Sequence, residues 1–254
     1  MKKLFIGCGV LALLVLGALG YFAWQVWPMV EEFSQKFTVF GSEMVALEEA
    51  YPFEHDDPDH LDSERFAASL QVRDDMAARF SAMESELDAY GREQEEADVG
   101  ILGLLDVVGG ALQRFMPIFD DVTTILDGAQ MGPSEFSHHT RVLWATLQAV
   151  DAGAAGPELE PLRGSFEEFR RRYGEMQREN SEDWPPFDEL IGAFEPGVIA
   201  TAKAVLAVDT QRVLDGLSDP FLEATYMRLD EFTWDFQEME REMNAGSEGG
   251  GAGG

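Results

Sequence analysis

The feature that most constrains this chain is a long uncharged run near its start. The run covers residues 4–30, follows only Met1 and two lysines, and ends directly before Glu31. A helix that crosses a bilayer needs about 20 consecutive apolar residues, so this run is long enough. A charge at the bilayer centre is costly, and uninterrupted apolar runs of this length are therefore typical of membrane segments. The sequence predicts a transmembrane signal anchor over residues 4–27.

The flanks of this segment predict its orientation. Lys2 and Lys3 favour a cytoplasmic N-terminus by the positive-inside rule, so we expect residues 1–3 to form a cytoplasmic stub. Trp24 and Trp27 lie at the other edge, and tryptophan favours the headgroup layer. We therefore expect Leu4–Trp27 to contact the lipid bilayer as a single pass, with the rest of the chain outside the cytoplasm, in the periplasm.

Two other interpretations of the segment remain open. A cleaved signal peptide would use the small residues at 18–20, but the apolar run continues past Gly20. A lipoprotein would be modified at Cys8, but too few apolar residues separate Lys3 from Cys8 for the apolar region of a signal. The uncleaved anchor fits the sequence best.

The charge balance excludes one class of partner. The chain has 48 acidic and 18 basic residues, a formal net charge of -30. Phosphate contacts need clustered Lys and Arg, so nucleic acid is not an expected partner. Cys8 is the only cysteine, and an intramolecular disulfide is therefore impossible. Residues 28–244 must be held together by a hydrophobic core.

Hydrophobic periodicity predicts an all-α fold. Apolar residues recur at spacings of three and four almost throughout residues 28–244, which is the helical period. Long helices with short connections predict an antiparallel helical bundle of about six to eight helices after the transmembrane helix. An acidic connector is expected over residues 52–62. The glycine-rich segment 245–254 is expected to be a disordered tail.

One helical stripe has the spacing of a coiled-coil seam. Its apolar positions alternate steps of four and three between residues 33 and 51, which is a heptad pattern directed at a partner helix. The members are Phe33, Phe37, Phe40, Met44, Leu47 and Tyr51. The pattern predicts contact with a protein partner, or self-association, through this seam.

Proline, glycine and capping residues predict where several helices begin and end. The most apolar stretch after the anchor, residues 99–128, is expected to be a buried central helix with a kink at Pro117. Gly132-Pro133, Gly156-Pro157 and Asp219-Pro220 each predict a helix start, because proline suits the first turn. Asp59 is the expected N-cap of one further helix. These four helix starts divide the remainder of the domain.

The best candidate for a metal site lies in the acidic connector. His55, Asp57, Asp59 and His60 combine imidazole and carboxylate groups, which divalent ions accept as ligands. His138 and His139 form the second histidine cluster. The spacing matches neither an EF-hand nor a helical histidine pair, and a solvated acidic linker explains the same residues.

The sequence favours binding over catalysis. No recognisable catalytic motif is present, and no cofactor is expected. The first hypothesis is a non-catalytic interaction or scaffold domain of the cell envelope, because the heptad seam follows the anchor directly. The alternative is a ligand- or metal-binding domain, with a pocket between helices near Trp144 or a metal at His55 and His60.

Overall fold

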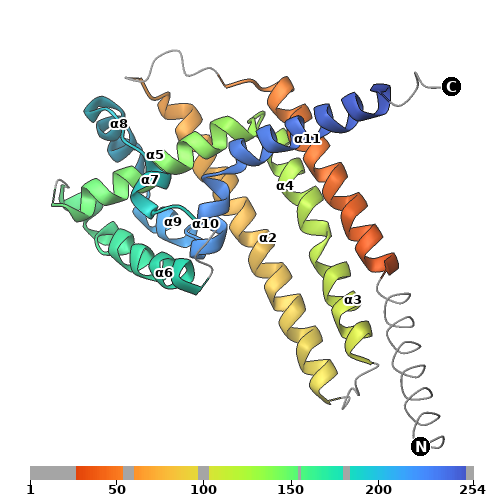
Figure 1. Ribbon diagram of the computed structural model, residues 1–254. Coiled ribbons are helices and arrows are strands. Elements are labelled where there is room, and N and C mark those ends of the chain that lie inside the picture. The colour runs from red at the N-terminus through yellow and green to blue at the C-terminus, as the bar shows by residue number, and fades with distance from the viewer. Residues whose placement is uncertain (1–26, 54–59, 97–102, 154–155, 180–183, 250–254) are drawn as a thin grey trace, which may run out of the picture. The chain divides into compact units, whose positions relative to one another are not determined.

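A computed structural model shows the fold of the chain (Figure 1). The described residues are 27–53, 60–96, 103–153, 156–179 and 184–249. All regular secondary structure in these ranges is helical, which confirms the all-α prediction. The predicted transmembrane segment 4–27 lies outside them except for Trp27. Of the helices in these ranges, none combines the length and the apolar character that crossing a membrane requires.

The helices follow one another through short connections. A helix over residues 27–50 comes first. It is followed by α2 (Ser63–Glu96), α3 (Gly103–Phe115), α4 (Pro117–Gly128), α5 (Pro133–Asp151), the 3-10 helix η1 (Pro157–Leu162), α6 (Ser165–Glu179), α7 (Phe187–Ile191), α8 (Pro196–Leu206), α9 (Thr210–Asp215), α10 (Pro220–Tyr226) and α11 (Leu229–Gly249). α11 continues beyond residue 244, so part of the expected disordered tail is helical.

The helices are more numerous than the six to eight expected, because several expected helices are divided. The described part of the stretch 99–128, from residue 103 on, forms α3 and α4, since Pro117 begins a new helix instead of only kinking one. Asp209 separates α8 from α9, because its side chain caps α9 by accepting a hydrogen bond from the backbone N–H of Arg212 at 3.0 Å. Gly156-Pro157 opens a 3-10 helix, and Gly164, with φ of 90°, precedes α6.

Of the remaining predicted helix starts, two are confirmed and one lies at a different residue. α5 begins after Gly132 and α10 after Asp219, as expected. α2 is capped by Asp62 instead of Asp59, because the Asp62 carboxylate accepts hydrogen bonds from the N–H groups of residues 64 and 65 at 2.9 and 3.1 Å. Leu61 and Phe66 flank this cap and join the same buried cluster, in the positions of a hydrophobic staple.

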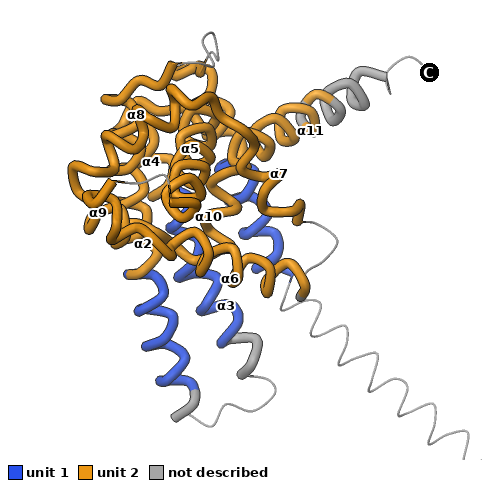
Figure 2. Tube along the Cα trace, turned by 90° about the vertical axis from the view of Figure 1, so that its left-hand side faces the viewer, with its two compact units in different colours: residues 1–40, 82–120 blue, residues 41–81, 121–254 orange. Residues whose placement is uncertain are grey.

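The chain divides into two compact units, which Figure 2 colours separately. Unit 1 contains residues 1–40 and 82–120, and unit 2 contains residues 41–81 and 121–254. The described core of unit 1 is aromatic. Phe119 of α4 receives three phenylalanines of the first helix at centroid distances of 6.1, 6.3 and 4.9 Å, namely Phe33, Phe37 and Phe40.

The heptad seam therefore packs on α4 of the same chain. Within unit 2, Met44 and Leu47 are buried, and the Tyr51 hydroxyl donates a hydrogen bond to Asp127 at 2.9 Å. Thr123 of α4 donates one to Glu43 at 3.0 Å. In the described residues this stripe contacts α4, and its contact with a second protein stays a prediction.

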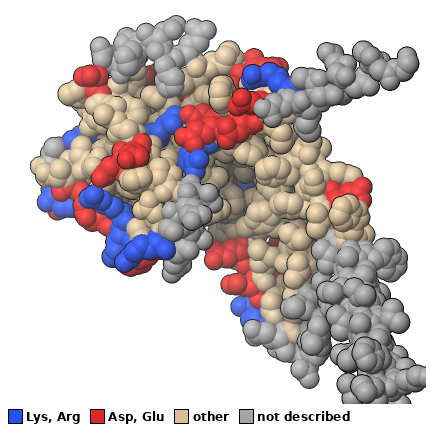
Figure 3. Space-filling view, viewed as in Figure 1, with Lys and Arg blue, Asp and Glu red and all other residues tan. Residues whose placement is uncertain are grey.

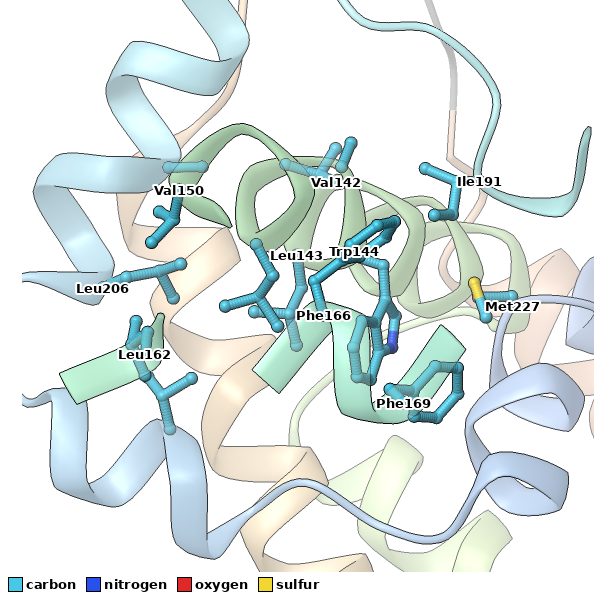
Figure 4. Close-up of a cluster of buried hydrophobic side chains, with 14 of the residues drawn as sticks. Val142, Leu143, Trp144, Val150, Leu162, Phe166, Phe169, Ile191, Leu206 and Met227 are labelled. Carbon is cyan, nitrogen blue, oxygen red and sulfur yellow. The ribbon is translucent and has the colours of Figure 1, made fainter. Parts of the chain in front are cut away.

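The buried central helix is α5, not the stretch 99–128. Most of α5 is buried, and it packs against α6, α7, α8, α10, α11 and η1. Trp144 of α5 is fully buried, with the Phe169 ring centred 3.9 Å away and the Phe187 ring 5.9 Å away (Figure 4). By contrast, Val108 of α3 is 48% exposed. The most apolar stretch is therefore not the most buried helix, because α5 buries threonine and serine as well as apolar residues.

Candidate functional site: a groove lined by α2, α8 and α9

A groove of about 770 Å³ opens in unit 2 between α2, α8 and α9. Its apolar lining comes from four helices, including α5, and contains Leu70, Leu143, Val205 and Val213. Pockets of a few hundred to about 1,000 Å³ with mostly apolar walls are typical of small-molecule sites. The groove therefore has the size and lining of a site for an apolar molecule.

Small side chains create this space. Ala67 of α2 and Ala200 and Ala204 of α8 line the groove. An alanine projects only one carbon from its helix, so facing alanines leave a hollow where leucines would interdigitate. α9 is short and begins at its own cap, Asp209, which also lines the groove. The groove thus follows from the sequence of α2 and α8 and from the break between α8 and α9.

The polar part of the groove lining contains one member of a buried ion pair. Arg73 of α2 lines the groove, and its side chain is only 3% exposed. Its Nη2 donates a hydrogen bond to Glu223 of α10, whose side chain is fully buried. The Glu223 carboxylate also accepts hydrogen bonds from the Ser218 backbone N–H and from Nε1 of Trp144, both at 2.8 Å. Three donors thus hold the carboxylate, and its charge balances that of Arg73.

One nitrogen of the Arg73 guanidinium lacks a partner. Nη1 is buried and makes no hydrogen bond to the described part of the chain. The Tyr226 ring lies 5.8 Å from the guanidinium carbon. Burial raises the pKa of Tyr226, so this phenol stays neutral. A buried donor without a partner costs about 1–3 kcal/mol, and such a group in a native protein calls for an explanation.

A second ion pair borders the groove. Arg212 of α9 pairs with Asp74 of α2 and also donates a hydrogen bond to Gln71. Gly216 lies close to this pair, because a Cβ there would be 2.4 Å from an Asp74 carboxylate oxygen. Asp74, Asp209 and Arg212 all line the groove. The pair therefore joins α2 to α9 at one side of the groove.

Three of the four candidate metal ligands, His55, Asp57 and Asp59, lie outside the described residues. The fourth, His60, is exposed. Within the described ranges no three His, Cys, Asp or Glu side chains group as a metal site would. His139 is buried in contact with Phe66, at a centroid distance of 5.7 Å, and serves the core.

Two neighbouring arginines of α6 are paired with acidic residues. Arg171 pairs with Glu168 and Glu175, each at 2.7 Å, and Arg170 pairs with Asp188 at 3.1 Å. Figure 3 shows basic and acidic side chains together over α6. Exposed pairs of this kind are screened by solvent and contribute little to stability, and each paired charge is already balanced by its neighbour.

The sequence prediction placed a pocket near Trp144 and missed the polar residues of the groove. Trp144 itself belongs to the core, whereas its neighbour Leu143 lines the groove. Arg73 carried a signal, because it lies three residues after Leu70 and three before Met76 on an otherwise apolar stripe of α2. A charged residue on such a stripe is seldom fully buried without a partner.

Comparisons of this chain with protein-family models, with curated proteins and with solved structures find no match. The function is therefore argued from the groove itself. Its two distinguishing features are a mostly apolar lining and the buried guanidinium of Arg73, whose Nη1 has no hydrogen-bond partner among the described residues.

Proposed function

We propose that this chain is a membrane-anchored binding protein whose helical domain takes up an apolar small molecule. The observation that carries the proposal is the groove of about 770 Å³ beside the buried Arg73, whose Nη1 has no partner among the described residues. The uncharged run supports the other half of the proposal, with residues 4–27 as the anchor and the domain in the periplasm.

The contacts of the first helix bear on the choice between the two hypotheses. The interaction or scaffold role was motivated by the heptad seam, and that seam packs on α4 through Phe119 and Asp127. The ligand-binding alternative has gained a pocket of suitable size. We therefore place ligand binding first, and the scaffold role stays a prediction.

The groove favours binding over acid–base chemistry. The Glu223 carboxylate accepts hydrogen bonds from three donors, so its oxygens are already engaged. Burial raises the pKa of Tyr226, which keeps this phenol protonated and unsuited to act as a base near neutral pH. These groups are arranged to hold a fixed polar surface beneath an apolar groove.

A substitution that fills the groove tests this function. Ala204→Phe places a ring in the groove from α8, while Ala46→Phe adds the same ring at an exposed position of the first helix, outside the groove lining. The full chain in lipid nanodiscs is melted with a panel of apolar compounds. We expect compounds that raise Tm of the wild type and of Ala46→Phe but not of Ala204→Phe. Equal shifts in all three proteins would contradict the proposal.

A further inference from the structure

We infer that two copies of this chain pair in parallel through an exposed, mostly apolar stripe on the first helix. The stripe consists of Trp27, Val30, Ser34 and Phe37, which follow one another at steps of three, four and three. It differs from the heptad seam at 33–51, with which it shares only Phe37. The inference rests on the anchor half of the proposed function, because the anchor holds both copies in one membrane.

The stripe is open to solvent along its length. Trp27 is 68% exposed, Val30 52% and Phe37 38%, and Ser34 between them is exposed as well. Single exposed apolar side chains are ordinary on protein surfaces. These residues instead recur at the heptad spacing on one face of one helix, which is the pattern that receives a second helix.

The neighbours of the first helix within unit 1 cover a different face. A Cβ at Gly109 of α3 would lie 2.6 Å from the Met29 side chain. Phe33 and Phe40 contact Phe119 of α4 at centroid distances of 6.1 and 4.9 Å. With 3.6 residues in each helical turn, these contacting positions centre about 100° around the helix from the stripe. The packing inside unit 1 therefore leaves room for another helix beside the stripe.

The stripe ends within the domain and is continuous with the anchor. The next position, Gly41, is buried, and a Cβ there would collide with the Phe236 ring of α11. At the other end, residues 1–26 lead directly into Trp27. In the sequence, the same steps continue backward through the uncharged run at Ala23, Gly20, Leu16 and Leu13. The occupant of the stripe should therefore rise from the same membrane, beside and parallel to this helix.

A second copy matches the stripe position for position. In a parallel coiled coil each a or d side chain packs at the level of its counterpart, and here Trp27 and Ser34 take position a and Val30 and Phe37 position d. A stable interface between free proteins buries about 1,200–2,000 Å². Four side chains on each copy cover less than this. Pairing therefore depends on the anchor, which confines both copies and raises their effective concentration.

Disulfide cross-linking in the membrane tests the pairing. The full chain, in the Cys8→Ser background, is expressed with two different tags in a bacterial host, and its membranes are oxidised. Ser34→Cys places a thiol on the stripe, whereas Glu32→Cys places one on the opposite side of the same helix, also exposed. We expect at least about fivefold more linked dimer, carrying both tags, from Ser34→Cys, because a disulfide needs Cα atoms within about 7 Å.

A charge on the stripe should break the pair. Val30→Asp, added to Ser34→Cys, brings two like charges together and should reduce the linked dimer about fivefold. Gln35→Asp adds the same charge at an exposed position off the stripe and should leave the linked dimer unchanged. Equal amounts of linked dimer in the two variants would overturn the inference.

Extraction of the membranes with alkaline carbonate separates this inference from the proposed function. If the chain leaves the membrane fraction, the anchor is wrong and the pairing falls with it. If the chain stays but Ser34→Cys cross-links no better than Glu32→Cys, the pairing is wrong and the anchor stands. A linked product that contains one tag and a different protein would also overturn the pairing.

Discussion

At the scale of single residues, the pair formed by Arg73 and Glu223 links the buried interior of unit 2 to the groove lining. The two side chains are buried together, and Glu223 also receives the indole N–H of Trp144. Burying two charges is costly, so a pair of this kind is weak evidence for stability by itself. Arg73 also lines the groove, so the proposed binding site gives a second reason for the presence of this pair.

Removing the Glu223 charge should destabilise the protein strongly. Glu223→Gln leaves the Arg73 guanidinium buried without its counter-charge, for which we expect a loss of about 3–5 kcal/mol in the free energy of unfolding. Glu168→Gln, which breaks an exposed pair with Arg171, is the matched control and should lose far less stability, because solvent screens that pair. Urea denaturation measures both. Equal losses would show that burial of the Arg73 pair has no energetic consequence.

The glycine before α5 is required by a close backbone approach. A Cβ at Gly132 would lie 2.5 Å from the carbonyl oxygen of Tyr51, and a backbone atom cannot rotate away as a side chain can. Gly132→Ala should therefore destabilise by about 1–3 kcal/mol in chemical denaturation. Gly174→Ala is the control, since a Cβ there meets nothing within 4 Å inside α6, and it should stabilise by about 0.5–1 kcal/mol. A neutral Gly132→Ala would refute the close contact.

Two buried tyrosines predict a loss of stability at alkaline pH. Burial raises the pKa of both Tyr173 and Tyr226 above the ordinary value of about 10. Above that pH the unfolded chain releases these protons while the folded chain retains them. The contribution of these two tyrosines to the free energy of unfolding is thus fully present below about pH 10 and declines as the pH rises further. The urea midpoint should fall between about pH 9 and pH 11, and less steeply in Tyr226→Phe. Identical pH profiles would contradict this assignment.

At the scale of secondary-structure elements, local signals and long-range contacts were not equally predictable. Proline and the residue before it correctly predicted the starts of α5 and α10, because a helix start depends on a few adjacent residues. The break between α8 and α9 leaves no mark in the apolar pattern, since an apolar stripe continues across Asp209 in the sequence. Periodicity reports which face of a helix is buried, but a single capping residue decides where the helix stops.

The groove could not be predicted from the sequence, because the residues that line it are far apart in the chain. Its lining joins residues 63–74 with residues 200–216, and Arg73 meets Glu223 across 150 positions of the chain. No short motif marks such a site, because each helix contributes only a few side chains. The stripe at 33–51 shows the converse case. Its spacing indicates a partner helix, and in the structure the stripe contacts α4.

At the scale of the whole molecule, the proposal joins a membrane anchor to a soluble binding domain, and the orientation is testable. Cys8→Ser removes the only cysteine, and Gln148→Cys then adds one at an exposed position of α5. We expect a membrane-impermeant maleimide to label this cysteine in intact spheroplasts of a bacterial host. Lys3→Cys, in the same Cys8→Ser background, is the control and should be labelled only after lysis. The reverse pattern would place the domain in the cytoplasm.

The central claim is that the groove between α2, α8 and α9 binds an apolar small molecule. Hydrogen exchange of the full chain in nanodiscs, measured with and without octan-2-one, tests it most directly because it reports every helix at once. The account predicts slower exchange in α8, α9 and residues 63–74, no change in α6, and no effect in Ala204→Phe. Protection confined to other helices, or protection that persists in Ala204→Phe, would contradict it.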